Sequence, residues 1–252
     1  MTSIHHSSRS IRHPLRAVLF DAVGTLIRPE PSVAAAYAQA GRRHGVDLAE
    51  EEIARRFRQA LARQDQLDRA HYAGRTDQQR EVNRWRDIVA DVFGPSPRAE
   101  LIFDDLWEHF AQPANWRLFD DAAATWDRLT SAGLTLGIAS NFDERLDGIC
   151  QALSPLSGCE HLFVSSRVGW RKPRPEFLAA IAERLHLAPA EMLLVGDDLE
   201  NDYLAARAAG WQAVHLDRTT SAGHHRDPRQ SVTGVATITT LADLADFPHP
   251  VA

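Results

Sequence analysis

Short apolar runs recur along the chain, and each ends in small or polar residues. They cover residues 17–21, 134–140, 161–166, 191–198 and 213–217. Because apolar residues fill consecutive positions, the pattern predicts strands that are buried on both faces, as in a parallel sheet. Helical apolar spacing marks residues 120–132, 175–187 and 199–209. Strands alternating with helices predict an α/β fold with a doubly wound, Rossmann-like parallel sheet.

One long segment interrupts this alternation. Residues 31–113 contain no strand-like run and are rich in Ala, Arg, Gln and Glu at helical spacing, with breaks at Gly74 and at residues 94–97. The segment predicts an inserted helical cap of about four helices. The core would then comprise residues 16–30 and 114–252, and residues 1–15 would form a polar N-terminal tail.

Composition and charge narrow the possible partners. The 252 residues allow one large domain with a smaller insertion. A net charge of -6 gives no reason to expect nucleic acid or an anionic membrane as a partner. No apolar run reaches membrane-spanning length, and the N-terminus lacks the apolar centre of a signal peptide, so we expect a cytoplasmic protein. Cys150 and Cys159 are expected to be free thiols, and a monomer and a homodimer are equally open.

Polar residues follow the predicted strands. In an open α/β sheet, ligands bind at the carboxyl ends of the strands. The residues expected at this edge are Asp21, Ser140, Asn141, Lys172, Asp197, Asp198 and Asp202. Taken singly, each has a commoner structural role, such as capping a helix. Their joint occurrence at one edge is what predicts a functional site.

Lys172 adds a compositional signal. The chain has 28 basic residues, and every one except Lys172 is arginine. An ammonium is a compact point charge, whereas a guanidinium is a broad fork. A site that admits only the compact group explains why lysine is kept at this position.

This set of residue types suits phosphoryl transfer. A carboxylate attacks phosphorus, and a magnesium ion with oxygen ligands offsets the repulsion between the two anions. Asp21 and Asp197 offer carboxylate ligands, and the backbone carbonyl of Val23 offers a third. The hydroxyl of Ser140 and the ammonium of Lys172 suit the remaining phosphate oxygens.

Four segments resemble the signature motifs of the haloacid dehalogenase superfamily of hydrolases. They are FDAVGTL, IASNF, GWRKPRPEF and VGDDLENDYLAA. The resemblance covers essentially the whole chain, with residues 31–113 as the helical cap of a subfamily I member. Within the superfamily, DAVGTL, SNFD and the region around Trp85 are most similar to the branch named after the rhythmically expressed gene 2 protein.

The resemblance implies a role for each residue. Asp21 would be the nucleophile and a magnesium ligand, and Lys172 would neutralise charge beside it. Ser140, Asn141 and Lys172 would bind the substrate phosphate. Asp197 would be the second carboxylate on the metal, and Asp198 and Asp202 would be further metal-site residues that bind the ion or support its ligands. The implied activity is a Mg²⁺-dependent phosphatase that acts on a small phosphorylated metabolite through an aspartyl-phosphate.

Val23 departs from the family pattern. Phosphatases of the superfamily usually read Asp-x-Asp, and the second Asp protonates the leaving group, a contribution of about 10²–10⁴ in rate. A phosphatase lacking it would favour good leaving groups such as acyl or aryl phosphates, or would borrow an acid from Glu30, His44 or His71. A metabolite-binding protein with weak or no catalysis is the alternative.

Two other activities of the superfamily are less favoured. A 2-haloacid dehalogenase needs no such acid, but the carboxylates at this edge would repel its anionic substrate. The phosphonate hydrolases of the superfamily use a cap lysine as a Schiff base, and the absence of lysine from residues 31–113 comes close to excluding this chemistry. Within the cap, Arg75, Arg84, Trp85 and Arg86 are candidate substrate contacts, although packing and surface roles are expected first. The His- and Arg-rich segment 218–230 is expected to be a solvated loop.

Overall fold

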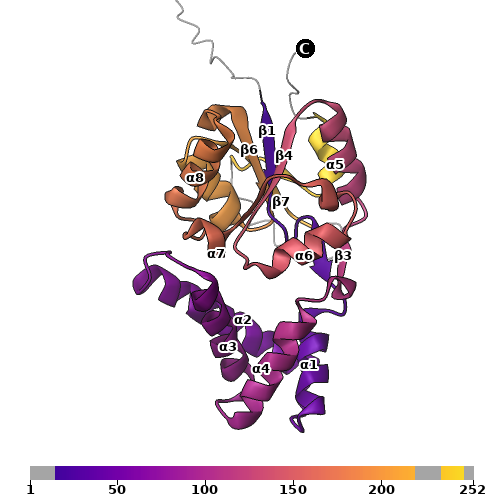
Figure 1. Ribbon diagram of the computed structural model, residues 1–252, viewed down its shortest axis with the longest axis vertical. Helices are drawn as coiled ribbons and strands as arrows, with labels where there is room; N and C mark the ends of the chain where they lie inside the picture. The colour runs from indigo at the N-terminus through magenta and orange to yellow at the C-terminus, as the bar shows by residue number, and fades with distance from the viewer. Residues whose placement is uncertain (1–14, 219–233, 247–252) are drawn as a thin grey trace, which may run out of the picture.

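The structure is a computed structural model that describes residues 15–218 and 234–246. It has two parts along its long axis, a parallel sheet with flanking helices and a group of four helices (Figure 1). The strand order is β5-β4-β1-β6-β7-β8, and all neighbours are parallel, which confirms the predicted α/β fold. The strands are β1 (Ala17–Phe20), β4 (Thr135–Ser140), β5 (Leu162–Val164), β6 (Met192–Gly196), β7 (Gln212–Leu216) and β8 (Thr237–Ile238).

The central strand β1 explains why the apolar runs are continuous. Its side chains alternate between the two faces of the sheet. Val18 and Phe20 join a core that contains residues of α5 (Ala122–Ser131) and α6 (Arg145–Ala152). Ala17 and Leu19 join a second core with residues of α8 (Pro175–Leu185) and α9 (Ala205–Ala208). Because helices cover both faces, every position of β1 is buried and apolar.

Several elements differ from the predictions. The helix predicted over 199–209 is a π-helical segment η4 (Leu199–Leu204) followed by the short α9. An antiparallel pair, β2 (Ile27–Pro29) with β3 (Trp116–Leu118), and the two-residue β8 were not predicted, because such short strands carry no periodic pattern. The remaining short elements are α7 (Ser165–Val168), η1 (Pro113–Asn115), η2 (Leu156–Gly158), η3 (Pro189–Glu191) and η6 (Leu241–Asp246).

Four helices lie between β2 and β3, where the insertion was expected. They are α1 (Val33–Arg43), α2 (Glu50–Ala70), α3 (Gln78–Phe93) and α4 (Pro97–His109). Three begin at a side-chain cap: Ser32, Asp77 and Ser96 each accept a hydrogen bond from a backbone amide of the first turn. The helices share an apolar cluster of their own, separate from the two cores of the sheet.

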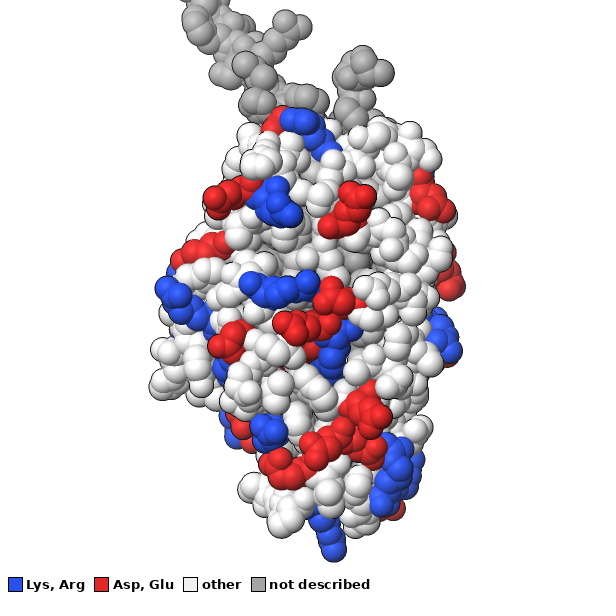
Figure 2. Space-filling view, in the orientation of Figure 1, with Lys and Arg blue, Asp and Glu red and all other residues white. Residues whose placement is uncertain are grey.

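No helix in the described part of the chain is long and apolar enough to cross a membrane. Cys150 and Cys159 are free, as expected. Acidic and basic side chains are interspersed over the face shown in Figure 2, so this face presents no extended basic area of the kind that nucleic acid requires. The predicted tail 1–15 and the loop 218–230 lie almost entirely outside the described residues.

Candidate active site

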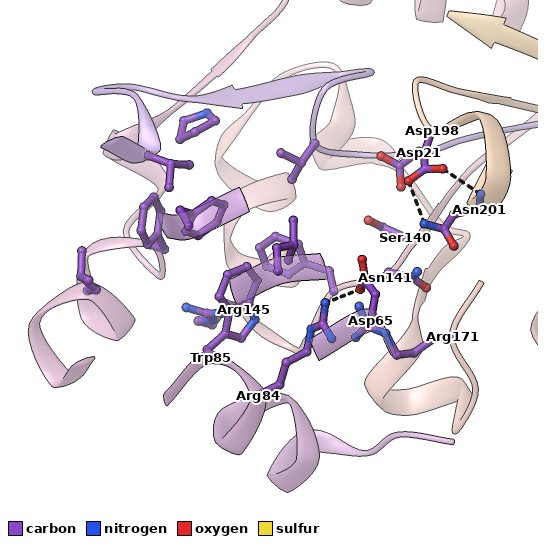
Figure 3. A pocket seen from close by; sticks show the side chains of 18 of the residues that line it. Asp21, Asp65, Arg84, Trp85, Ser140, Asn141, Arg145, Arg171, Asp198 and Asn201 are labelled. Carbon is purple, nitrogen blue, oxygen red and sulfur yellow. Dashed lines mark hydrogen bonds and ion pairs between the residues drawn. The ribbon is translucent and has the colours of Figure 1, made fainter. Parts of the chain in front are cut away.

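Three carboxylates gather at the carboxyl edge of the sheet. Asp21 directly follows β1, and Asp197 directly follows the neighbouring strand β6. Asp202 reaches the same point from η4. Each of the three offers an oxygen within 4.8 Å of the others. Ser140, the last residue of β4, lies beside Asp21 on the same edge (Figure 3).

Lys172 lies at the base of this cluster and is buried. Its Nζ donates to Asp21 Oδ1 at 2.8 Å, to Asp202 Oδ1 at 2.5 Å and to the backbone carbonyl of Ala139 at 2.7 Å. These partners satisfy all three of its donors. Although burial opposes its charge, the carboxylates of Asp202 and Asp21 raise the pKa of Lys172 above its ordinary value. Lys172 is therefore a fixed cation that holds Asp21 and Asp202 in place.

Asn141 positions the Lys172 backbone. Its side-chain oxygen accepts from the Lys172 amide at 2.7 Å, and its side-chain nitrogen donates to the Lys172 carbonyl at 2.9 Å. Asn141 was expected to contact the substrate. The residue does line the cavity, but both polar atoms of its side chain are used by Lys172.

Two glycines make room for the acids. Gly24 has φ +91°, and a Cβ there would lie 2.3 Å from Asp197 Oδ2. A Cβ on Gly196 would lie 2.1 Å from Asp202 Oδ2. Both positions require a residue without a side chain. Thr25, which is fully buried, donates its hydroxyl to Asp197 Oδ1 at 3.1 Å and fixes the orientation of that carboxylate.

The cluster carries more negative charge than Lys172 balances. Asp197 keeps surface exposure as a residue, but its carboxylate is desolvated beside Gly24 and Thr25. This desolvation, together with the charges of Asp21 and Asp202, raises the pKa of Asp197 to about 7. Burial and then the charge of Asp21 also raise the pKa of Asp202 to about 7, against the opposing effect of Lys172.

These donors fit a hard divalent cation such as Mg²⁺, which prefers carboxylate oxygens. Asp202 uses one oxygen for Lys172, and its Oδ2 accepts from the Asp198 amide at 3.1 Å. Asp21 and Asp197 therefore have the oxygens best placed to hold the ion. The Val23 carbonyl remains a predicted third ligand; Val23 itself lines the cavity with Asp21.

Asp198 lies outside the carboxylate cluster. Its Oδ1 accepts from the amides of Glu200 and Asn201 at 2.9 Å, and its Oδ2 accepts from the Asn201 side chain at 2.7 Å. Asp198 is therefore the N-cap of η4, and these bonds use both of its oxygens. It contributes to the site by holding the segment that carries Asp202.

A cavity of about 340 Å³ extends from the acids to the inserted helices (Figure 3). Among the described residues, its lining does not include Glu30, His44 or His71, the acids considered as replacements for the missing Asp. Glu30 instead pairs with Arg117 at 3.1 Å, and His44 lies 3.1 Å from a carboxylate oxygen of Asp105.

Of the four candidate cap contacts, two line the cavity. Trp85 lies on the wall and also packs against the helical cluster. Arg84 is buried and bonds to Asp65 at 2.6 Å and to Asp68. The other two lie elsewhere: Arg86 pairs with Glu100, and Arg75 stacks on Trp170 with 4.2 Å from its guanidinium to the ring centre.

Two arginines of the site were missed by the sequence analysis. Arg171 reaches across to the cap and bonds to Glu81, and both side chains are buried. Arg145 bonds to Asp143 at 2.7 Å and lies 3.6 Å from the ring centre of Trp107. Arg171 stands next to Lys172 in the motif, which was a usable signal; Arg145 had none in a chain this rich in arginine.

Residues 15–210 match the family model of the haloacid dehalogenase-like hydrolases. The chain belongs to this family. It is 29% identical over 222 residues to haloacid dehalogenase-like hydrolase domain-containing protein 3 of Danio rerio, covering 86% of this chain and 91% of that protein. It is 27% identical over 249 residues to phosphoglycolate phosphatase of Shigella boydii, covering 93% of this chain and 94% of that protein.

The rhythmically expressed gene 2 protein of Drosophila melanogaster is 24% identical over 213 residues, covering 79% of this chain and 82% of that protein. This identity is lower than that of the domain-containing protein 3 from Danio rerio. The predicted membership of the superfamily is therefore confirmed. The predicted placement in the branch of the rhythmically expressed gene 2 protein is not supported, because the domain-containing protein 3 is more similar to this chain.

Solved structures of the family share the fold. A defluorinating L-2-haloacid dehalogenase has a TM-score of 0.73 at 21% identity, covering 92% of this chain and 94% of that one. A phosphatase of the family from Thermococcus onnurineus has a TM-score of 0.64 at 23% identity, covering 94% of this chain and 100% of that one. A putative hydrolase from Bacillus subtilis, solved with magnesium bound, has a TM-score of 0.66 at 19% identity, covering 92% of this chain and 96% of that one. Because phosphatases and dehalogenases both match, the fold alone does not decide the reaction.

Proposed function

We propose that this protein is a Mg²⁺-dependent phosphatase that acts on a small phosphorylated metabolite through an aspartyl-phosphate on Asp21. The observation that carries the proposal is the contact between Lys172 Nζ and Asp21 Oδ1, within a cluster of three carboxylates. A lysine that already neutralises one oxygen of Asp21 leaves the other oxygen for attack on phosphorus.

The reaction would proceed in two displacements at phosphorus. An Asp21 oxygen forms a bond to phosphorus while the bond to the leaving oxygen breaks, and the leaving group departs with the electron pair. A water molecule then attacks the same phosphorus, which releases phosphate and restores the Asp21 carboxylate. Ser140 would bind a phosphoryl oxygen, while Lys172, whose three donors are used by Asp21, Asp202 and Ala139, would neutralise charge beside it. Mg²⁺ held by Asp21 and Asp197 would offset the repulsion between carboxylate and phosphate.

Val23 sets the expected limits of this activity. It lines the cavity beside Asp21 but has no proton to give to the leaving oxygen. The general acid that it replaces contributes about 10²–10⁴ in rate. We therefore expect slow turnover of ordinary sugar phosphates and faster turnover of esters with good leaving groups.

The carboxylates support a phosphatase over a dehalogenase. With Asp197 and Asp202 beside Asp21, a substrate carboxylate would meet net negative charge unless a cation were bound. A metabolite-binding protein that has lost catalysis would keep the same phosphate contacts, so turnover must be measured. We also propose that residues 31–113 act as the cap that covers the bound substrate.

The test is phosphate release from acetyl phosphate, p-nitrophenyl phosphate and sugar phosphates, with Mg²⁺ and with EDTA. Asp21→Asn is the test variant. Asp147→Asn is its matched control, since Asp147 is a partly exposed acid outside the cavity lining that pairs with Arg167. Mg²⁺-dependent release that is lost in Asp21→Asn alone would support the proposal. No release from any ester would favour a binding role, and halide release from 2-chloropropionate would favour a dehalogenase.

A further inference from the structure

The cavity wall between the acids and the inserted helices carries many aromatic side chains. It is formed by Tyr37, Phe57, Trp85, Phe103, Trp107, Phe110, Trp116 and Phe142. Phe57, Trp85, Trp107 and Phe110 are only partly buried although they pack against the helical cluster. Large aromatic side chains that line a cavity without being fully buried are suited to cover an apolar group of a ligand.

Six of these rings form a continuous series of contacts, and Phe103 and Trp107 form a separate pair with ring centres 5.7 Å apart. Trp85 stacks on Phe57 with ring centres 6.4 Å apart, and Phe57 meets Tyr37 edge to face at 5.3 Å. From Tyr37 the contacts run through Phe110 and Trp116 at 6.4 and 6.0 Å. All of these separations lie in the range of favourable aromatic pairs.

The aromatic surface reaches the phosphate end of the cavity. Trp116 meets Phe142 at 5.9 Å, and Phe142 is two residues beyond Ser140, which ends β4 at the acids. A phosphate bound at Asp21 would therefore place its ester oxygen, and the group attached to it, against this surface. The rings would therefore contact the leaving group itself and not a remote part of the substrate.

The guanidinium groups that line the cavity offer no unbalanced charge for a second anionic group of the substrate. Arg84 is paired with Asp65 and Asp68, Arg145 with Asp143, and Arg171 with Glu81. Each guanidinium is thus already balanced by a carboxylate of the protein. The wall also contains the apolar side chains of Val33, Leu61, Val89 and Leu106. Its further polar residues Asp65 and Asn201 bond to Arg84 and Asp198 of the protein. A sugar, with many hydroxyls to satisfy, would find few partners there.

We propose that the substrate is an aryl phosphate, the phosphate monoester of a phenol, with its ring held against this aromatic surface. The proposal rests on the phosphatase function proposed above. It joins two separate observations, the aromatic wall and the missing acid at Val23. A phenol has a pKa of about 10, as in tyrosine, against about 15.7 for water. A phenolate therefore leaves with its electron pair without prior protonation and takes a proton from solvent afterwards.

The test compares four substrates in steady-state kinetics of the whole chain with Mg²⁺. 2-Naphthyl phosphate has a ring and a phenolic leaving group; 2-naphthylmethyl phosphate has the ring with an alkyl leaving group. Acetyl phosphate has a good leaving group without a ring, and n-octyl phosphate has an apolar chain without either. We expect both naphthyl esters to have a lower KM than acetyl phosphate and n-octyl phosphate, because the ring adds binding. We expect kcat for 2-naphthyl phosphate to exceed kcat for 2-naphthylmethyl phosphate by about 10² or more.

Variants of the wall test where the ring binds. Trp85→Leu and Trp107→Leu should each raise KM for 2-naphthyl phosphate about three- to tenfold more than KM for acetyl phosphate. Tyr72→Leu is the matched control, because Tyr72 is exposed and does not line the cavity. A melting temperature for each variant separates loss of folding from loss of binding. Equal KM changes for both substrates would overturn the proposal, as would n-octyl phosphate with a KM equal to that of 2-naphthyl phosphate.

A binding measurement separates failure of this proposal from failure of the phosphatase function. Calorimetry with 2-naphthylmethylphosphonate and with methylphosphonate, neither of which is hydrolysed, reports the ring contribution alone. At least tenfold tighter binding of the naphthyl compound, without turnover of any ester, would retain the aryl site and reject the phosphatase. Turnover of all esters with equal binding of the two phosphonates would retain the phosphatase and reject the aryl site.

Discussion

Lys172→Met removes the charge on which the arrangement of the site depends. The substitution keeps an unbranched side chain of similar length but removes the three hydrogen bonds from Nζ. Asp21 and Asp202 then lose their shared cation, and the carboxylate of Asp202 is almost fully buried. Leaving a buried charge without its partner typically costs about 3–5 kcal/mol of folding stability. For a chain of this size, this predicts a fall in melting temperature of about 6–20 °C.

Arg174→Met is the control for this variant. Arg174 lies two residues away and pairs with Glu176 at 2.6 Å, but both side chains are more than one third exposed. Exposed pairs contribute only about 0–1 kcal/mol, so the melting temperature should fall by at most about 4 °C. Circular dichroism melts of both variants, in EDTA at pH 7.5, provide the comparison.

A double variant gives the decisive result. Adding Asp202→Asn to Lys172→Met removes the buried charge that the first change left without a partner, so part of the lost stability should return. Equal melting temperatures for Lys172→Met and the Arg174→Met control would refute the reasoning. A double variant less stable than Lys172→Met would refute it as well.

Three further predictions concern the acids and the contact between the cap and the core. Gly24→Ala should abolish Mg²⁺ binding measured by calorimetry, because its Cβ would meet Asp197, whereas Gly45→Ala, also at positive φ but with nothing within 4 Å, should bind Mg²⁺ normally. In metal-free protein the pKa of Asp197 is raised from 3.8 to about 7, so folding stability is lost as pH rises through that interval. Thermal melts should therefore show that Mg²⁺ raises the melting temperature more at pH 8 than at pH 6. Asp197→Asn should remove this difference. Glu81→Gln should lower stability by about 3–5 kcal/mol and speed amide exchange at residues 169–172, because it leaves Arg171 without its main partner; unchanged exchange would contradict this.

The sheet and its acidic edge could be predicted because their signals are local. A strand covered on both faces requires consecutive apolar residues, and β1 and β6 show this directly in the sequence. Asp21, Ser140 and Asp197 then follow from the rule that parallel strands present their carboxyl ends at one edge. Lys172 stood out because arginine serves at every other basic position.

The cavity could not be predicted, since it depends on how the four helices lie over the sheet. Helical spacing identifies Phe57 and Trp107 as inward-facing, but it does not tell whether a side chain or an empty space lies opposite. Asp198 shows a related limit: its position beside Asp197 suggested a metal ligand, while local hydrogen bonds make it a helix cap. Arg171 pairs with Glu81 across 90 positions of the chain, a contact that only the folded structure brings together.

The central claim is that Asp21 forms a covalent bond to phosphorus. The most direct measurement is mass spectrometry of the peptide that contains Asp21, after acid quenching during turnover of 2-naphthyl phosphate with Mg²⁺. We predict a phosphoryl group on Asp21 that is absent when EDTA replaces Mg²⁺ and absent in Asp21→Asn. Turnover without a phosphorylated Asp21, or with the phosphoryl group on another residue, would contradict the claim.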